Sequence, residues 1–387
     1  MKHLPVIILL AGVLSGCSFM SSMIGSDDNT EPPAELEKLE NPVALRRLWS
    51  TSIGVGYDSQ FVRLIPAVSG ERVLAADRRG RVAAYDAGSG KELWETRTDA
   101  PVSAGPGVGE DMVLVGTSDA RILAIGLENG ELLWEANVSS EVLSVPQIDR
   151  GVVVVQSVDG NVTGLDAIDG RQLWIYDRDV PVLTLRGTST PAVGYGAVIA
   201  GFASGKVAAL TIDQGIVAWE TNVAVPKGRS EIERMVDVDG DPVILGSAVY
   251  VATYQGRVAV IDAQSGNLGW TRDMSSHAGL GVDFSQVYIT DQESNVWALT
   301  RDSGGSVWKQ DKLLNRTLTA PTPYKNYVAV GDFEGYVHLL SRYDGTIAAR
   351  VKIDSKGVSA RPLVVDDIMY VYGNSGTLAA YSVPDDG

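Results

Sequence analysis

Cysteine and histidine are scarce in this chain of 387 residues, and their scarcity excludes several functions. The single cysteine, Cys17, cannot form a disulfide bond within the chain. The three histidines, His3, His277 and His338, are too few for a histidine-rich metal centre and leave little material for Ser-His or Cys-His catalysis. The sequence therefore predicts no catalytic residues, no cofactor and no metal ligands.

Basic residues are also few compared with acidic ones. Lys and Arg total 32 against 48 Asp and Glu, which gives a net charge of −16 and disfavours binding to nucleic acid. Charged residues make up only 21% of the chain and hydrophobic residues 45%, a balance that excludes a disordered chain. No helical period runs far enough to predict a coiled coil.

One acidic segment resembles the start of a calcium loop. Asp237 and Asp239 belong to the segment DVDGD, but an EF-hand also needs Gly at loop position six and Glu at position twelve. Pro242 and Ala248 occupy those two positions. We therefore expect no calcium site in this segment.

The first seventeen residues have the features of a lipoprotein signal. Lys2 precedes an apolar run from Leu4 to Leu14, which is too short to span a membrane. The run ends in LSGC at Cys17, which resembles a bacterial lipobox; an ordinary secretory signal with an incidental cysteine is the alternative. We expect a lipid anchor on Cys17 and a flexible tether over residues 17–42. Ser18 implies, by analogy with enterobacterial sorting, the periplasmic face of the outer membrane.

A repeat of about 40 residues organises the rest of the chain. In six copies a tryptophan follows a glycine by four positions: Trp94, Trp134, Trp174, Trp219, Trp270 and Trp308. A seventh copy carries Ala349 in the tryptophan place. Each copy contains short runs rich in Val, Leu and aromatics between glycine turns, which predicts a β-meander. The recurring Asp86, Asp166 and Asp262 are expected to accept hydrogen bonds within turns.

Eight such copies predict an all-β fold, an eight-bladed β-propeller of four-stranded antiparallel blades. The last copy supplies only three strands, and the segment LRRLWS around Trp49 matches the missing outer strand. We expect this N-terminal strand to complete the last blade and close the ring, which removes an unpaired edge. The repeated tryptophans are expected to pack one blade on the next. The predicted organisation is a signal peptide over 1–16, a lipidated tether over 17–42 and a propeller over 43–387.

The repeat units GLDAIDGRQLW and VIDAQSGNLGW resemble the PQQ-type propeller repeat. That family includes quinoprotein dehydrogenases, so a PQQ-dependent quinoprotein-like enzyme is an alternative function. The resemblance implies, for such enzymes, a quinone cofactor with calcium, commonly stacked on a vicinal disulfide. The single cysteine cannot supply that disulfide.

Two successive repeats are longer than the others, and their extra residues predict a binding surface. The extra residues fall at 179–187 and 226–242, each between the outer strand of one blade and the inner strand of the next. Both connections are expected on the same face, side by side. Apolar side chains beside charged ones suit a protein interface, and the candidates are Leu183, Leu185, Arg186, Asp237 and Asp239. The alternative is two longer loops in which Arg186 pairs with Asp237 or Asp239.

Together the lipobox, the repeats, and the segments LTLRG and EIERMVDVDGDPVI resemble the BamB family of lipoproteins in the outer-membrane β-barrel assembly machinery. The resemblance implies a non-enzymatic scaffold that binds the POTRA region of BamA through Leu183, Leu185 and Arg186, with Asp237 and Asp239 in support. It implies a monomer within a hetero-complex that includes the other assembly lipoproteins, with unfolded outer-membrane proteins as further partners. A propeller that binds another envelope protein is a second alternative.

Overall fold

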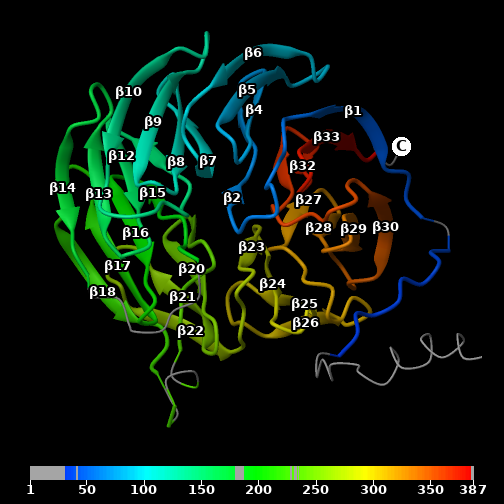
Figure 1. Ribbon diagram of the computed structural model, residues 1–387. Helices are drawn as coiled ribbons and strands as arrows, with labels where there is room; N and C mark the ends of the chain where they lie inside the picture. Colours follow the sequence, from blue (N-terminus) through cyan, green and yellow to red (C-terminus); the bar gives the residue numbers. More distant parts are fainter. Residues whose placement is uncertain are drawn as a thin grey trace, which may run out of the picture. The chain divides into compact units, whose positions relative to one another are not determined.

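The computed structural model describes residues 31–40, 42–178, 187–226, 229–230, 233 and 235–384. Residues up to Pro33 and residues from Ala34 onward form two compact units, and the strands belong to the second. In that unit eight sheets are arranged around a ring (Figure 1). The predicted all-β, eight-bladed propeller is therefore confirmed.

Four consecutive strands, from the inside of the ring outward, form each of the first seven blades. Blade 1 contains β3 (Ala67–Ser69), β4 (Arg72–Ala76), β5 (Arg81–Asp86) and β6 (Glu92–Arg97), and blade 2 contains β7 (Val102–Gly109), β8 (Met112–Thr117), β9 (Arg121–Gly126) and β10 (Leu132–Asn137). Blade 3 contains β11 (Gln147–Asp149), β12 (Val152–Gln156), β13 (Val162–Asp166) and β14 (Gln172–Tyr176), and blade 4 contains β15 (Ala192–Gly194), β16 (Ala197–Gly201), β17 (Lys206–Thr211) and β18 (Val217–Asn222). Blade 5 contains β19 (Val243–Leu245), β20 (Ala248–Ala252), β21 (Arg257–Asp262) and β22 (Leu268–Asp273). Blade 6 contains β23 (Leu280–Val282), β24 (Gln286–Thr290), β25 (Val296–Thr300) and β26 (Ser306–Gln310). Blade 7 contains β27 (Thr322–Tyr324), β28 (Tyr327–Gly331), β29 (Tyr336–Ser341) and β30 (Ile347–Lys352).

Blade 8 joins the two ends of the propeller. Its strands are β31 (Leu363–Val365), β32 (Ile368–Tyr372), β33 (Thr377–Ser382) and, on the outside, β1 (Arg46–Ser52). β1 runs antiparallel to β33, with Trp49 opposite Ala380, and the two lie side by side in Figure 1. The N-terminal strand thus closes the ring, as predicted.

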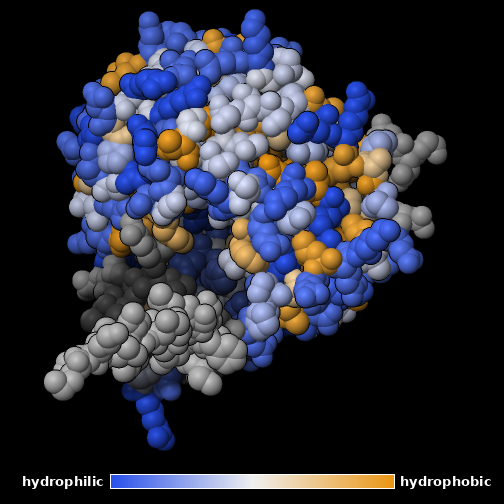
Figure 2. Space-filling view, turned by 45° about the vertical axis from the view of Figure 1, so that its right-hand side comes forward, coloured by the Kyte–Doolittle hydropathy of each residue, from blue (hydrophilic) through white to orange (hydrophobic). Residues whose placement is uncertain are grey.

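The core lies between the blades. Both faces of a middle strand are covered by neighbouring blades, so such strands are apolar throughout: all five residues of β12, VVVVQ, are buried. Outer strands alternate instead: Trp134 and Ala136 are the buried residues of β10, and Trp174 is the buried residue of β14. On the face drawn in Figure 2, hydrophilic residues predominate among the described ones, and hydrophobic residues form separate groups.

Each repeated tryptophan bridges its blade to the next one. A register shift in the outer strand precedes Trp134, and such a bulge redirects a side chain out of the regular alternation. The Trp134 indole donates a hydrogen bond of 2.8 Å to the carbonyl of Ala167 in blade 3. Its ring covers Gly170, where an added Cβ would lie 2.6 Å from the indole and φ is +73°. The same contact recurs at every tryptophan of the repeat, which confirms the predicted packing role.

The exception, Ala349, lies at the seam between blades 7 and 8. β33 and β1 come from opposite ends of the chain, so no hairpin turn joins them, and there is no glycine turn for a tryptophan to cover. Val43 and Leu45 pack into the cluster that contains Ala349 instead. The departure from the repeat therefore follows from the way the ring closes.

Candidate functional site

The connections from each outer strand to the next inner strand leave one rim of the ring, which we call the connector face. Strands alternate in direction within a blade. The turn between the first and second strands and the turn between the third and fourth strands therefore lie on the opposite rim. A cavity of about 840 Å³ opens on the connector face. Its lining comes from connections around the ring and includes Tyr57, Leu143, Thr188, Asp239, His277, Thr319 and Ser359.

The described ends of the two long connections lie against each other on this face. The first connection joins β14 to β15 and the second joins β18 to β19. The backbone N–H of Thr190 donates to Asp241 Oδ1 at 2.6 Å. A Cβ on Gly187 would lie 3.1 Å from Asp239 Oδ1. The predicted partner contacts on the first connection lie outside the described residues: Leu183, Leu185 and Arg186.

The two acidic candidates of the second connection are partly or fully buried. Asp237 is 4% exposed, and its carbonyl accepts a hydrogen bond of 2.7 Å from the Tyr254 N–H. Asp239 Oδ1 is buried and has no hydrogen-bond partner among the described residues. Burial raises the pKa of Asp239 to about 6, and the positive charge of Arg63 opposes that rise. Carboxylates held in such unfavourable surroundings concentrate at functional sites.

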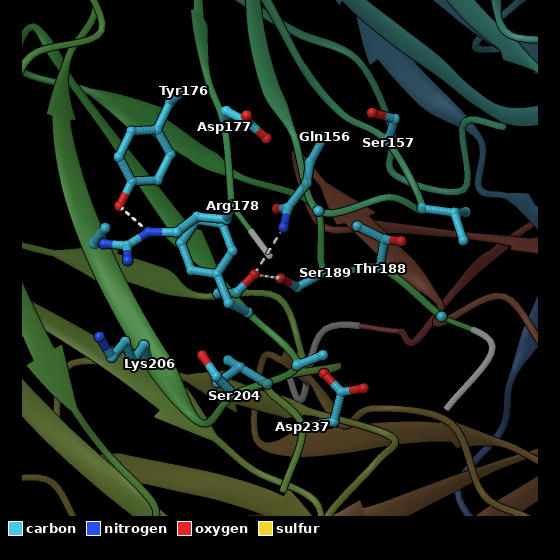
Figure 3. Close-up of a pocket in the computed structure, with 18 of the residues that line it drawn as sticks. Gln156, Ser157, Tyr176, Asp177, Arg178, Thr188, Ser189, Ser204, Lys206 and Asp237 are labelled. Carbon is cyan, nitrogen blue, oxygen red and sulfur yellow. Dashed lines mark hydrogen bonds between the residues drawn. The ribbon is translucent and has the colours of Figure 1, made fainter. Parts of the chain in front are cut away.

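A second cavity of about 360 Å³ lies between blades 3 and 4, and residues from both long connections line it (Figure 3). Arg178 Nε donates to the Tyr176 hydroxyl at 2.6 Å, and that hydroxyl donates to Glu220 Oε1 at 2.6 Å. Gln156 Nε2 donates to the Gly201 carbonyl at 2.9 Å. Polar and charged groups lie in this lining beside apolar ones such as Phe202 and Val238.

A third long connection, between β1 and β3, was not predicted from the sequence. Pro66 follows Trp49 by 17 positions, as Pro191 follows Trp174, whereas Pro106 follows Trp94 by only 12. The extra residues form β2 (Arg63–Leu64), which pairs in parallel with β7 of blade 2. The same count of positions that revealed the other two connections would have found this one.

The described residues contain no cluster of three or more His, Cys, Asp or Glu side chains that would hold a metal ion. Asp86 and Asp262 accept the N–H groups of Ser89 and Ser265 at 2.8 Å, which confirms their predicted role in turns. Within the same described part, no helix is long and apolar enough to cross a membrane.

The two internal histidines lie in different environments. His338 is fully buried, with Nε2 3.0 Å from Asp332 Oδ2 and Nδ1 accepting from Arg350 Nε at 3.2 Å. His277 lines the larger cavity. Burial lowers the pKa of both, which disfavours the charged form of each imidazole.

The ring and its connector face define a β-propeller scaffold of PQQ-type repeats, whose longest connections gather on one face. A family model described as "Outer membrane protein assembly factor BamB" matches residues 46–125 and 78–310. A protein of that name from Pseudomonas aeruginosa is 50% identical over 383 residues, which cover 99% of both chains. This chain therefore belongs to the BamB family.

Solved structures agree with this assignment. The crystal structure of BamB from Moraxella catarrhalis has a TM-score of 0.80 at 26% identity, over 88% of this chain and 100% of that one. A quinohemoprotein alcohol dehydrogenase from Pseudomonas putida HK5 has a TM-score of 0.70 at 15% identity, over 88% and 76% of the two chains. The second likeness concerns the fold alone, and family membership supports the prediction of a non-enzymatic protein.

Proposed function

We propose that this chain is a non-enzymatic assembly factor for outer-membrane β-barrel proteins. It is anchored through Cys17 at the periplasmic face of the outer membrane and binds the POTRA region of BamA through its connector face. Membership of the BamB family supports the assembly role and membership of the assembly complex.

The observation that carries the docking site is the convergence of long connections on one face. Loops are costly to order, so a rigid ring that holds them together reduces the entropy lost when a partner binds. The polar cavity between blades 3 and 4 and the buried carboxylate of Asp239 add specific chemistry beside the connections. Leu183, Leu185 and Arg186 are the proposed contacts, with Asp237 and Asp239 in support.

Co-purification from membranes tests the docking site. We expect Leu183→Ala, Leu185→Ala and Arg186→Ala each to reduce recovery of BamA, and Arg186→Glu to reduce it further, because a reversed charge at an interface repels its former partner. Ile168→Ala is the matched control, since Ile168 is 89% exposed in a turn on the opposite rim. Unchanged recovery with folded connector variants, or equal loss with Ile168→Ala, would show that the partner binds elsewhere.

Membrane fractionation tests the anchor. Cys17→Ala removes the only thiol that a lipid can modify, so we expect the protein to move from the outer-membrane fraction to the soluble periplasmic fraction. The propeller should stay folded, because Cys17 precedes the unit that contains the strands. Retention of the variant in the membrane fraction without BamA would contradict lipid anchoring.

A second candidate function is the guidance of unfolded outer-membrane proteins. Outer strands have free edges that another strand can pair with, and they expose apolar side chains: Leu93, Leu133, Leu173, Ile175 and Val217. The chain itself adds to one such edge, since the Val43 N–H donates to the Ala348 carbonyl at 2.8 Å. A photo-crosslinking residue in place of Leu133 should capture substrates, whereas one in place of Ile168 should not.

A further inference from the structure

Arg63 lies where all three long connections meet. Its backbone is fixed, because β2 pairs with β7 and Leu64 beside it is fully buried. The Tyr57 hydroxyl, in the same connection, donates to the Leu64 carbonyl at 2.9 Å. The Arg63 side chain therefore starts from a rigid position and extends over the connector face.

The Arg63 guanidinium binds both of the other connections. Nη1 donates to the carbonyl of Thr188 at 2.7 Å, in the first connection. Nη2 donates to Asp241 Oδ1 at 2.6 Å, in the second, and the same oxygen accepts the Thr190 N–H. The side chains of Arg63 and Asp241 are only 26% and 15% exposed, so solvent screens this contact less than an ordinary surface ion pair.

We propose that Arg63 is a positioning residue that holds the two long connections in the arrangement needed to bind a partner. This proposal rests on the proposed function, and it assigns a role to the segment that also closes the ring. The planar guanidinium can bind a carbonyl and a carboxylate at once in a fixed geometry. Asp241 Oδ1 accepts hydrogen bonds from both Arg63 Nη2 and the Thr190 N–H, so Asp241 attaches the second connection to the other two.

The positioning role matters because single contacts, and not a strand ladder, hold these ends; besides Arg63, the Val145 N–H donates to Thr190 Oγ1 at 3.2 Å. Thr188 and Thr190 precede β15 and lie outside any described strand, as does Asp241 before β19. Without Arg63, Asp239 and Asp241 would also lose the nearby cation that offsets their negative charges. Local opening of both ends would then become easier while the blades stay intact.

Hydrogen exchange at the Thr190 amide tests this directly, because its only described acceptor is the Asp241 carboxylate. In the full-length chain we expect Arg63→Ala to accelerate that exchange about tenfold, and Arg63→Lys to give an intermediate rate, since an ammonium keeps the charge without the fork. Arg72→Ala is the matched control: Arg72 pairs with Glu128, its side chain is 27% exposed, and it lies on the opposite rim. That control should leave Thr190 unchanged.

Binding to BamA completes the test. We expect Arg63→Ala to weaken BamA binding about tenfold, while the midpoint of unfolding of the blades stays unchanged. Leu183→Ala should also weaken BamA binding, but it should leave exchange at the Thr190 amide unchanged. Unchanged exchange at the Thr190 amide in Arg63→Ala would overturn the positioning role. Faster exchange would also overturn it if Arg63→Ala binds BamA normally while Leu183→Ala binds BamA poorly. Normal binding by the Leu183, Leu185 and Arg186 variants contradicts the proposed interface instead, and Thr190 exchange still decides whether Arg63 holds the connections. If Arg63→Ala does not fold, Arg63→Gln serves in its place, with the same outcomes.

Discussion

At the scale of single residues, the repeated tryptophan explains both the period of the sequence and the stacking of the blades. Trp219 donates to the Ala263 carbonyl at 2.9 Å and covers Gly266 of the next blade. The one tryptophan outside the repeat position, Trp297, is different: it donates to Asp291 in its own blade, at 2.9 Å. The two positions therefore allow the bridging role to be separated from the cost of losing an indole.

Replacing a bridging tryptophan should be among the most destabilising single changes. We expect Trp219→Ala to lower the free energy of unfolding by about 3–5 kcal/mol, because it leaves a cavity between two blades and an unpaired carbonyl. Trp297→Ala should cost clearly less, since Trp297 is only partly buried and its indole bonds no carbonyl of the next blade. Urea unfolding of the two variants measures the difference, and equal losses would contradict the bridging role.

Asp239 is a residue whose ionisation should oppose folding. Its pKa is raised from 3.8 to about 6, so between these pH values the folded chain binds a proton that the unfolded chain releases. Its contribution to stability is therefore present at low pH and lost as pH rises through 6. We expect Asp239→Asn to raise the free energy of unfolding at about pH 7.5 by about 1–3 kcal/mol and to flatten this pH dependence.

The functional cost of that change distinguishes a binding residue from a mere defect. If Asp239 supports partner binding, Asp239→Asn should bind BamA more weakly although it is more stable, a trade-off typical of functional sites. Asp273→Asn is the control, because the Asp273 side chain is 93% exposed. A stabilised variant with undiminished binding would remove Asp239 from the proposed interface.

At the scale of elements, the strands and the ring could be predicted because their signals are local and repeated. Glycine turns, apolar runs and one tryptophan per unit specify each blade, and the N-terminal match around Trp49 specifies the closure. The connector face was predicted only in part. The lengths of two connections were visible, whereas the contact of Arg63 with Thr188 and Asp241 joins residues far apart in sequence and leaves no periodic trace. Contacts of that kind follow only from the closed ring.

The segment over residues 34–37 shows a further element that the sequence did not indicate. It lies within the predicted tether, yet the Ala34 N–H donates to the Leu314 carbonyl at 2.9 Å. The Ala34 carbonyl accepts from Arg316 Nη1 at 2.9 Å, and the Glu37 carbonyl accepts from Arg350 Nη1 at 3.0 Å. Arg316 and Arg350 also contact the buried pair of Asp332 and His338, so the segment is attached to the interior of blade 7.

Removing Arg316 should release this segment and destabilise blade 7. The side chains of Arg316 and Asp332 are 3% and 0% exposed, and breaking such a buried pair costs about 3–5 kcal/mol. Lys312→Ala is the control, because Lys312 also contacts the segment, through Glu37 at 2.8 Å, but is 57% exposed, so solvent screens the pair and its loss should cost far less. Limited proteolysis should cut within 34–40 much faster in Arg316→Ala than in Lys312→Ala. Equal cleavage rates would mean that the buried network does not hold the segment.

At the scale of the whole molecule, one N-terminal stretch links closure of the ring to the connector face. β1 supplies the outer strand of blade 8, and the chain then crosses to β2, whose Arg63 contacts the two other long connections. Stability of the ring and shape of the proposed docking site therefore depend on the same residues.

Truncation separates closure from the contacts of the preceding segment. A chain that begins at residue 43 keeps β1 and should remain a folded monomer, although it loses the contacts of the preceding segment, among them those of residues 34–37. A chain that begins at residue 54 lacks β1, so β33 is left with an open edge of unpaired backbone groups that other chains can pair with. We expect the second chain to aggregate or to form oligomers by size-exclusion chromatography with light scattering, and Trp49→Ala, which keeps β1 but loses its bridge to blade 1, to stay monomeric at reduced stability. A monomeric, equally stable chain from residue 54 would mean that seven complete blades and three strands close without the N-terminal strand.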